Sequence, residues 1–270
     1  MTVMRQPLPP WTMPGGPLPA TTRARPIAAP NATLAGRTEV TATLATFVVV
    51  TDSPVSGFKP GQYVSLGVYS GTELIQRPYS IVSLSDDRLR LEFLIRRLPD
   101  GRLSNLLWPL PAGDRVHVGP VKGLFTLDAD DHRPRVMVAT GSGLAPMLAM
   151  LESAFTNHDK TPSVLIHGVS FHAELAYQRQ IAAWSAAGLP LDYRPTVSRP
   201  REVRNAGWVG PVGRAETQLE ALLHEWRWLR AGGSVAYLCG NPEMTRACAE
   251  VLGAAGFAPA DIRVELFHAA

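Results

Sequence analysis

The chain has 270 residues, enough for two domains of ordinary size, and 46% of them are hydrophobic, enough for a buried core. Its formal net charge of +3 comes from its start, where four arginines precede the first acid, Glu39, while the later 22 bases and 23 acids nearly balance. This distribution argues against a nucleic-acid-binding surface, and no apolar run is long enough to span a membrane.

The cysteine and histidine content narrows the chemistry further. Cys239 and Cys248 are the only cysteines, so this chain cannot supply the four thiolates of an iron–sulfur cluster. Two cysteines also do not make a disulfide framework. The seven histidines show no spacing typical of metal ligands. We therefore expect no metal site.

Residues 1–35 are expected to form a flexible extension. They are rich in proline, glycine, alanine and threonine and show no apolar periodicity. They lack the continuous apolar core of a secretory signal, and their prolines disfavour the amphipathic helix of an organelle transit peptide. We therefore expect a cytoplasmic protein, with a docking arm as an alternative role for this segment.

Residues 36–131 have the pattern of a small antiparallel β-barrel. Apolar residues alternate with others in two runs: Val40, Ala42, Leu44, Val48 and Val50, and then Leu89, Leu91, Phe93 and Ile95. Turn signals rich in proline, glycine and aspartate separate the runs, as at Asp52-Ser53-Pro54 and Pro99-Asp100-Gly101. Short strands at this spacing are typical of a barrel.

Within this region, Arg77-Pro78-Tyr79-Ser80 combines an arginine, an aromatic ring and a hydroxyl. An arginine can hold a phosphate through two parallel hydrogen bonds, a ring can stack on another planar ring, and a hydroxyl can donate to a ring nitrogen. This set suits a large planar cofactor that carries a pyrophosphate. A surface arginine beside a core tyrosine would have the same sequence.

Residues 132–270 change to an alternation of strands and helices, which predicts a parallel sheet with helices on both faces. The expected strands are 136–139, 164–167, 193–197, 235–239 and 262–266. Thr140 to Pro146 follows the first strand and opens a helix, as a pyrophosphate loop does. It lacks the third glycine of the common dinucleotide fingerprint, so a plain tight turn is the alternative.

Five motifs, taken in order, resemble the ferredoxin–NADP reductase family of flavoproteins over roughly residues 38–270. They are Phe58–Tyr63, Arg77–Ser80, Gly101–Leu106, Thr140–Pro146 and Cys239–Met244. The resemblance implies an antiparallel β-barrel that binds FAD, followed by an α/β parallel-sheet domain that binds NAD(P). It also implies an enzyme that transfers electrons between NADPH and a separate one-electron carrier, such as ferredoxin or flavodoxin.

The resemblance also assigns site residues. FAD would contact Arg77, Pro78, Tyr79 and Ser80, the next strand at Phe93, Leu94, Ile95 and Arg96, and the loop residues Gly101, Leu103, Ser104 and Asn105, with Phe267 on its isoalloxazine. The nicotinamide dinucleotide would contact Thr140, Gly141, Ser142, Gly143, Pro146, Ser198, Arg199, Arg214, Cys239 and Gly240. Ser80, Cys239 and Glu265 would be the catalytic residues.

The choice between NADP and NAD depends on the ends of two strands. Gly168-Val169-Ser170 has no acid of the kind that binds the ribose hydroxyls of NAD. Similar bacterial reductases often have an arginine after Gly-Val, and Ser170 departs from that pattern. Arg199 and Arg214 do match the NADP-binding pattern, so we expect NADP, with NAD possible.

Two other functions fit the same motifs. One is the NADH- or NADPH-dependent reductase component of an oxygenase or hydrogenase-like complex. The other is a non-catalytic flavin-binding sensor or binding subunit. Intact Ser80, Cys239 and both phosphate loops argue against a loss of turnover.

Overall fold

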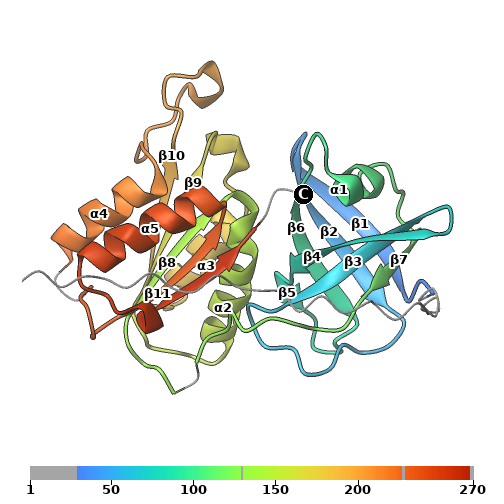
Figure 1. The fold of residues 1–270 in the computed structure, drawn as a ribbon, viewed down its shortest axis with the longest axis horizontal. Coiled ribbons are helices and arrows are strands. Elements are labelled where there is room, and N and C mark those ends of the chain that lie inside the picture. The colour runs from blue at the N-terminus through green and yellow to red at the C-terminus, as the bar shows by residue number, and fades with distance from the viewer. Residues whose placement is uncertain (1–28, 129, 227–228, 268–270) are drawn as a thin grey trace, which may run out of the picture.

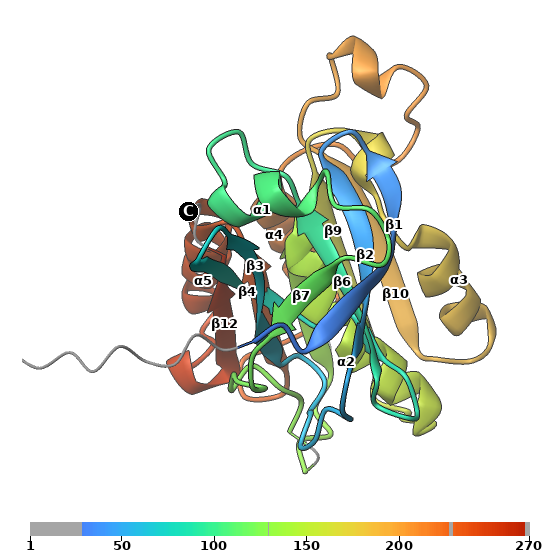
Figure 2. The ribbon, with the colours of Figure 1, turned by 90° about the vertical axis from the view of Figure 1, so that its right-hand side faces the viewer.

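The protein forms two domains that lie side by side (Figures 1 and 2). The structure, a computed structural model, describes residues 29–128, 130–226 and 229–267. The first domain is an antiparallel β-barrel and the second is a parallel α/β sheet, as the sequence predicts. No helix in the described ranges is long and apolar enough to cross a membrane.

The barrel is built from seven strands in the order β4-β3-β7-β1-β2-β6-β5, with all pairs antiparallel. A six-residue helix, α1 (Arg102–Leu107), follows β6. The strands are β1 (Ala32–Thr41), β2 (Leu44–Thr51), β3 (Tyr63–Ser70), β4 (Glu73–Ser80), β5 (Ser83–Leu84), β6 (Arg90–Arg96) and β7 (Arg115–Val118).

The first strand begins earlier than the predicted domain boundary. β1 starts at Ala32, and Ala32 and Leu34 are fully buried in the barrel core. The Asn31 side chain also exchanges hydrogen bonds with the backbone of Val118 at 2.8 and 2.9 Å. The proposed extension 1–35 therefore includes part of the barrel, and residues 1–28 lie outside the described range.

The alternating residues of β2 divide between two environments. Ala45, Phe47 and Val49 are buried in the barrel core. Leu44 lies on the opposite face, together with the half-buried Val48 and Val50, and it packs into the core of the second domain. The predicted face of Leu44, Val48 and Val50 is thus the outer face of the barrel.

The second domain has five parallel strands in the order β10-β9-β8-β11-β12. They are β8 (Arg135–Thr140), β9 (Ser163–Val169), β10 (Leu191–Val197), β11 (Val235–Gly240) and β12 (Ile262–Leu266). Four α-helices connect them: α2 (Leu144–Thr156), α3 (Gln178–Ala186), α4 (Ala215–Glu225) and α5 (Pro242–Ala254). Four 3-10 turns complete the set: η1 (Gly141–Gly143), η2 (His172–Glu174), η3 (Val203–Asn205) and η4 (Pro259–Asp261).

The helices cover both faces of this sheet because strand side chains alternate. Met137 and Ala139 of β8 share a core with Met147 and Leu148 of α2 and with α3. The other face carries a second core, to which the strands and the helices α4 and α5 contribute Val136, Val138, Ala236, Leu238, Leu219, Leu222, Cys248 and Leu252. A sheet buried on both faces gives the continuous apolar strands seen in the sequence.

The two domains contact each other through the outer face of the barrel. Leu44, Val82 and Leu94 belong to the same buried cluster as α2. Polar contacts cross the boundary as well, among them Thr46 with Tyr177, Tyr177 with Glu92, Ser83 with Glu152, and Arg96 with Glu174. This packing holds the barrel beside the carboxyl ends of β8 and β11, where a cleft opens.

Candidate active site

A cleft of about 1660 Å³ runs between the domains and is lined from both of them. Small-molecule pockets usually measure roughly 300–1,000 Å³, so this cleft has room for two large ligands. Of the predicted site residues, it is lined by Arg77, Pro78, Tyr79, Ser80, Arg96, Gly101, Leu103, Ser104, Thr140, Gly141, Ser142, Ser198, Arg199, Arg214, Gly240, Glu265 and Phe267.

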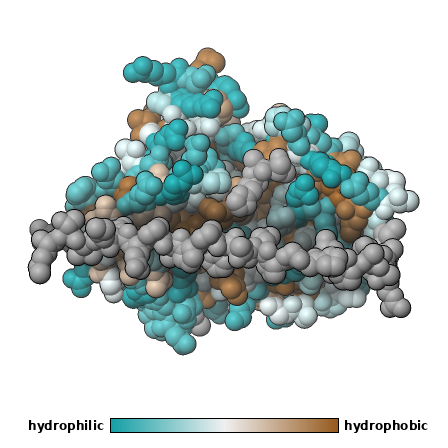
Figure 3. Space-filling model, viewed as in Figure 1, coloured by the Kyte–Doolittle hydropathy of each residue, from teal (hydrophilic) through white to brown (hydrophobic). Residues whose placement is uncertain are grey.

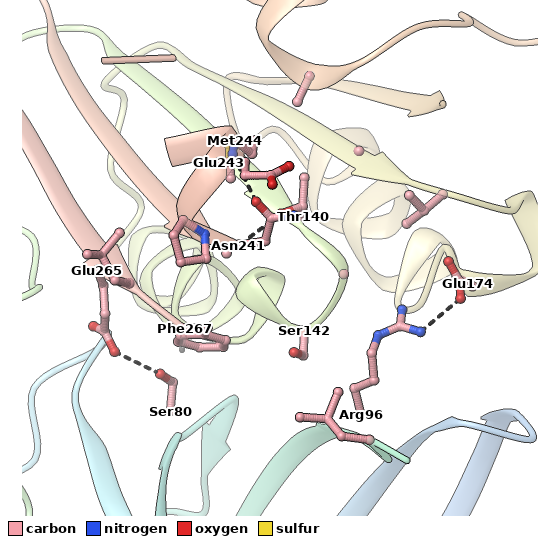
Figure 4. A pocket seen from close by; sticks show the side chains of 18 of the residues that line it. Ser80, Arg96, Thr140, Ser142, Glu174, Asn241, Glu243, Met244, Glu265 and Phe267 are labelled. Atoms are coloured by element: carbon pink, nitrogen blue, oxygen red, sulfur yellow. Dashed lines mark hydrogen bonds and ion pairs between the residues drawn. The ribbon is translucent and has the colours of Figure 1, made fainter. Parts of the chain in front are cut away.

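Ser80 and Glu265 meet across the domain boundary in the cleft (Figure 4). The Ser80 hydroxyl donates a hydrogen bond of 3.3 Å to Glu265 Oε1, although the residues are 185 positions apart. Burial raises the pKa of Glu265 to about 7, and the bond from Ser80 opposes that shift. This carboxyl group therefore holds or releases a proton near neutral pH.

Phe267 and Tyr79 supply aromatic surface to the same cleft. Phe267 follows β12 and is held by its backbone N–H, which donates to the Gly240 carbonyl at 3.0 Å. Figure 4 shows its ring between Ser80 and the loop that carries Ser142. Burial raises the pKa of Tyr79 to about 12, so its hydroxyl keeps its proton and remains a donor. Both rings are suited to stacking on a planar ligand.

The loop before α1 differs in part from its predicted role. The Ser104 hydroxyl is buried, accepts from the Leu98 N–H at 3.2 Å and donates to the Gly101 carbonyl at 3.5 Å, so it braces the loop in this structure. Asn105 donates to the carbonyls of Leu98 and Pro99 and does not line the cleft. The first-turn amides of Arg102, Leu103 and Ser104 have no acceptor within the helix and remain available to an anion.

The loop after β8 is held by close backbone packing. A Cβ atom added at Gly143 would lie 2.4 Å from the Cys239 carbonyl oxygen, so only glycine fits between η1 and β11. Pro146 is buried in the first turn of α2, where its missing donor costs no hydrogen bond. Neither residue lines the cleft, and both shape the loop that presents Gly141 and Ser142.

Four other predicted residues have different surroundings from those expected. Phe93 and Ile95 are fully buried in the barrel core, and Leu94 faces the second domain. The Cys239 side chain is fully buried in the core beside α2, and burial together with Glu265 raises the pKa of its thiol. Because this thiol does not line the cleft, the arrangement gives no support to its predicted catalytic role.

The far end of the cleft carries positive charge. Ser198 and Arg199 are exposed after β10, and Arg214 precedes α4, with Glu216 at 3.8 Å from its guanidinium. Ser170 and Phe171, after β9, line the same end. Arg204 was not predicted, but its guanidinium lies 3.6 Å from the centroid of the Phe171 ring. No local motif marks Arg204, because the loop that carries it is placed by long-range contacts.

Arg96 and Glu174 form a second link across the cleft, visible in Figure 4. Arg96, at the end of β6, pairs with Glu174 of η2 at 2.9 Å. Its guanidinium also lies against the loop after β8, since a Cβ at Gly141 would be 3.4 Å from Arg96 Nη2. Glu174 was not predicted from the sequence. The pair joins the barrel strand to the loop of the second domain.

Comparison with known proteins identifies both domains. Residues 31–126 match the oxidoreductase FAD-binding domain family, and residues 137–250 match the oxidoreductase NAD-binding domain family. The flavodoxin/ferredoxin–NADP reductase of Escherichia coli is 30% identical over 221 residues, which cover 75% of this chain and 82% of that protein. The chain belongs to the ferredoxin–NADP reductase family.

Other proteins that are similar to this chain are named after different electron-transfer systems. The toluate 1,2-dioxygenase electron transfer component of Pseudomonas putida is 35% identical over 214 residues, or 78% of this chain and 59% of that protein. The chain thus spans little more than half of that relative. Among solved structures, a Neisseria gonorrhoeae ferredoxin NADP+ reductase with bound FAD and NADP is 29% identical, with a TM-score of 0.74 over 87% of this chain and 97% of that one.

The residues of the cleft fit the two cofactors that the family implies. The free amides of α1 and the Arg77 guanidinium suit the pyrophosphate of FAD, and Tyr79 and Phe267 offer faces for its ring system. Gly141 and Ser142 suit the pyrophosphate of a nicotinamide dinucleotide, and its adenosine end would then reach Arg199 and Arg214 at the far end of the cleft. The protein is therefore a flavoprotein oxidoreductase with separate FAD-binding and NAD(P)-binding domains.

Proposed function

We propose that this protein transfers electrons between NADPH and a separate one-electron carrier protein, such as a ferredoxin or a flavodoxin. The observation that carries this proposal is the meeting of Ser80 and Glu265 at the junction of the two cofactor domains. FAD, when bound, would supply hydride exchange with a nicotinamide and single-electron exchange with a carrier. The relatives named as ferredoxin–NADP reductases support the choice of carrier.

The residues at the junction have distinct roles in this proposal. Arg77 would bind a flavin phosphate, and Tyr79 and Phe267 would offer their rings to the flavin. The Ser80 hydroxyl, on the buried end of β4, is placed to donate to a flavin ring nitrogen. Glu265, with its pKa of about 7, holds a proton beside Ser80 and can exchange it at neutral pH.

The test begins with the cofactor. Heat should release non-covalent FAD, identified by mass, and FMN alone or no flavin in folded protein would contradict the proposal. Anaerobic addition of NADPH should then bleach the flavin absorbance, and added ferredoxin or flavodoxin should restore it. A yellow protein that neither NADPH nor NADH bleaches would support the alternative of a binding or sensing subunit.

A second candidate is the reductase component of an oxygenase complex. The 35% identity to the toluate dioxygenase electron transfer component favours it. Both candidates use the same cofactors, so only the acceptor distinguishes them. Rapid reoxidation by an oxygenase component, with slow reoxidation by ferredoxins and flavodoxins, would favour the second candidate over the first.

The preference for NADPH is tested with Arg199→Ala. Arg199 lines the adenosine end of the cleft and is exposed, so removing its charge should weaken contact with the extra phosphate of NADP without disturbing the fold. We expect kcat/KM for NADPH to fall by roughly 1–3 kcal/mol in transition-state stabilisation, with NADH nearly unaffected. Arg246→Ala, an exposed arginine on α5 outside the cleft, is the control. Equal losses with both nucleotides would mean that Arg199 contacts a group that NADPH and NADH have in common.

A further inference from the structure

Two arginines gather on one aromatic ring at the adenosine end of the cleft. The guanidinium carbon of Arg204 lies 3.6 Å from the centroid of the Phe171 ring, and that of Arg199 lies 5.7 Å from it. Among the described residues, no carboxylate lies within 4.0 Å of either guanidinium. Each contact is a cation–π contact, but together they leave two like charges side by side without a counter-ion.

Arg204 comes from a loop that projects away from the sheet. This loop connects β10 with α4 and forms the protrusion at the top of Figure 1. Figure 3 shows that its surface is mostly hydrophilic. The loop also carries Arg201, which is exposed like Arg199 and Arg204. Only Arg199 and Arg204 of this loop stack on Phe171 among the residues described.

A buried asparagine fixes the base of this loop. Asn205 is 3% exposed, and its Oδ1 accepts the His172 N–H at 2.8 Å. Its Nδ2 donates to the carbonyl of Ser170 at 2.9 Å and to that of Arg199 at 2.8 Å. One side chain therefore joins the loop to the ends of β9 and β10. A buried amide with these bonds holds its neighbour, Arg204, over Phe171.

The end of β9, next to this loop, carries no charged side chain at the cleft. Ser170 and Phe171 follow β9 and line the cleft, and neither is ionised. Trp208 adds a second anchor, because its ring stacks on His172 with centroids 6.2 Å apart and planes at 14°. The loop thus brings a guanidinium from outside to a site whose own strand end is neutral.

We propose that Arg204, together with Arg199, determines nucleotide specificity by binding the 2′-phosphate of NADP. This inference rests on the proposed function and adds a residue to its nucleotide site. A phosphomonoester carries nearly two negative charges at neutral pH and matches the forked donors of guanidinium groups. The long, exposed Arg204 side chain can turn from the face of Phe171 to a phosphate bound beside the ring.

The test measures binding and does not depend on turnover. Isothermal titration calorimetry of the flavin-loaded protein compares adenosine 2′,5′-bisphosphate with 5′-AMP, which lacks the 2′-phosphate. Wild type should bind the bisphosphate more tightly. Arg204→Ala should weaken its binding roughly 10-fold to 100-fold, the range for a lost charge-assisted hydrogen bond, while 5′-AMP binding stays nearly unchanged.

The matched control is Arg201→Ala, which removes the same charge from the same loop. It should change binding of the bisphosphate by less than about twofold, since long-range effects of exposed charges are screened. A third variant, Asn205→Ala, keeps every arginine but releases the base of the loop. It should weaken bisphosphate binding while leaving 5′-AMP binding close to wild type.

The outcomes separate this inference from the proposed function. Unchanged bisphosphate binding in Arg204→Ala, or equal losses in Arg201→Ala and Arg204→Ala, would overturn the role of Arg204 and leave the NADPH preference standing. A wild type that binds both probes equally would overturn both statements. A selective loss in Arg204→Ala and Asn205→Ala alone supports the inference.

Discussion

At the scale of single residues, Glu265 shows how burial sets the chemistry of the cleft. It lies on β12, paired in register with Cys239, and its carboxyl group is partly buried against the barrel. Water no longer stabilises the charged form fully, so its pKa rises from 4.5 to about 7. The same carboxyl group on an exposed strand would be ionised at neutral pH.

Replacing Glu265 with Gln should change how stability depends on pH. Because the folded pKa is raised, the contribution of the neutral carboxyl group is fully present below pH 4.5 and is lost as pH rises through about 7. Glutamine does not ionise, so the variant should gain thermal stability relative to wild type between pH 5 and pH 8. Paired melting curves at both pH values measure this, and a constant difference would mean that Glu265 is solvated.

His167 shows the opposite shift. It is fully buried on β9 with its Nδ1 3.1 Å from the Tyr193 hydroxyl, and burial lowers its pKa from 6.5 to about 4. The neutral ring is therefore the folded form throughout the neutral range. The stabilisation that comes from the neutral His167 ring is fully present above pH 6.5. It is lost as pH falls towards 4, because the unfolded chain gains the proton first.

His167→Gln should accordingly reduce acid sensitivity. The shift from 6.5 to about 4 corresponds to about 3 kcal/mol of free energy of unfolding, which wild type loses on acidification and the variant keeps. Urea unfolding at pH 7.5 and pH 4.5 measures how much stability each protein loses on acidification. Similar losses in the two proteins would contradict the buried, neutral state of His167.

At the scale of elements, the turn from β8 into α2 depends on a close approach of two backbones. Gly143 packs directly against the end of β11, where a Cβ atom would lie 2.4 Å from the Cys239 carbonyl oxygen and 2.7 Å from Gly240 Cα. These neighbours are backbone atoms, so they cannot turn aside as a side chain can. The contact places η1 at the cleft, which is how a local glycine motif acquires a binding geometry.

Gly143→Ala should therefore be destabilising, by roughly 1–3 kcal/mol, the range for overpacking a well-filled site. It should also weaken binding of nicotinamide dinucleotides, since Gly141 and Ser142 would move with the loop. The control is Gly253→Ala on α5, where a Cβ would meet nothing within 4 Å and alanine favours the helix. Thermal melts of both variants check this, and equal melting temperatures would show that the loop adjusts freely.

At the scale of the whole molecule, the two domains are joined by a shared core and by polar contacts around it. Tyr177, just before α3, donates from its hydroxyl to Glu92 Oε1 on β6 and lies 3.1 Å from Thr46 Oγ1 on β2. Burial and the Glu92 charge both raise the pKa of Tyr177, so the hydroxyl remains a donor. This contact helps to orient the barrel against the parallel sheet.

Tyr177→Phe should weaken the joint between the domains. The ring is kept, but Glu92 loses its donor, so we expect a loss of about 1–3 kcal/mol in the free energy of unfolding. If the joint couples the domains, the calorimetric transition should also broaden or split. Tyr193→Phe, within the second domain, is the comparison, because its hydroxyl bonds to His167 and not across the boundary. A single, unshifted transition would assign domain coupling to the apolar contacts alone.

The sequence by itself determined what depends on local patterns: the two domains, the alternation of strands and helices, and the motif loops that line the cleft. β11 ends at Gly240 and α2 begins at Leu144, as the apolar run and the glycine turn indicate, because each depends on neighbouring residues. Only the tertiary structure decided which of these residues meet. For example, the thiol of Cys239 points into the core beside α2. Strand alternation alone does not predict this, because helices cover both faces of the sheet.

The same physical reason applies to the pairs that define the site. Ser80 and Glu265 are 185 positions apart, and Arg204 reaches Phe171 because Asn205 ties a loop to two strand ends. Such contacts depend on how whole elements pack, and no periodicity or local motif encodes them. The residue types were therefore predictable. The pairing of Ser80 with Glu265 depends on how the two domains pack, and the position of Arg204 depends on how its loop packs on the sheet.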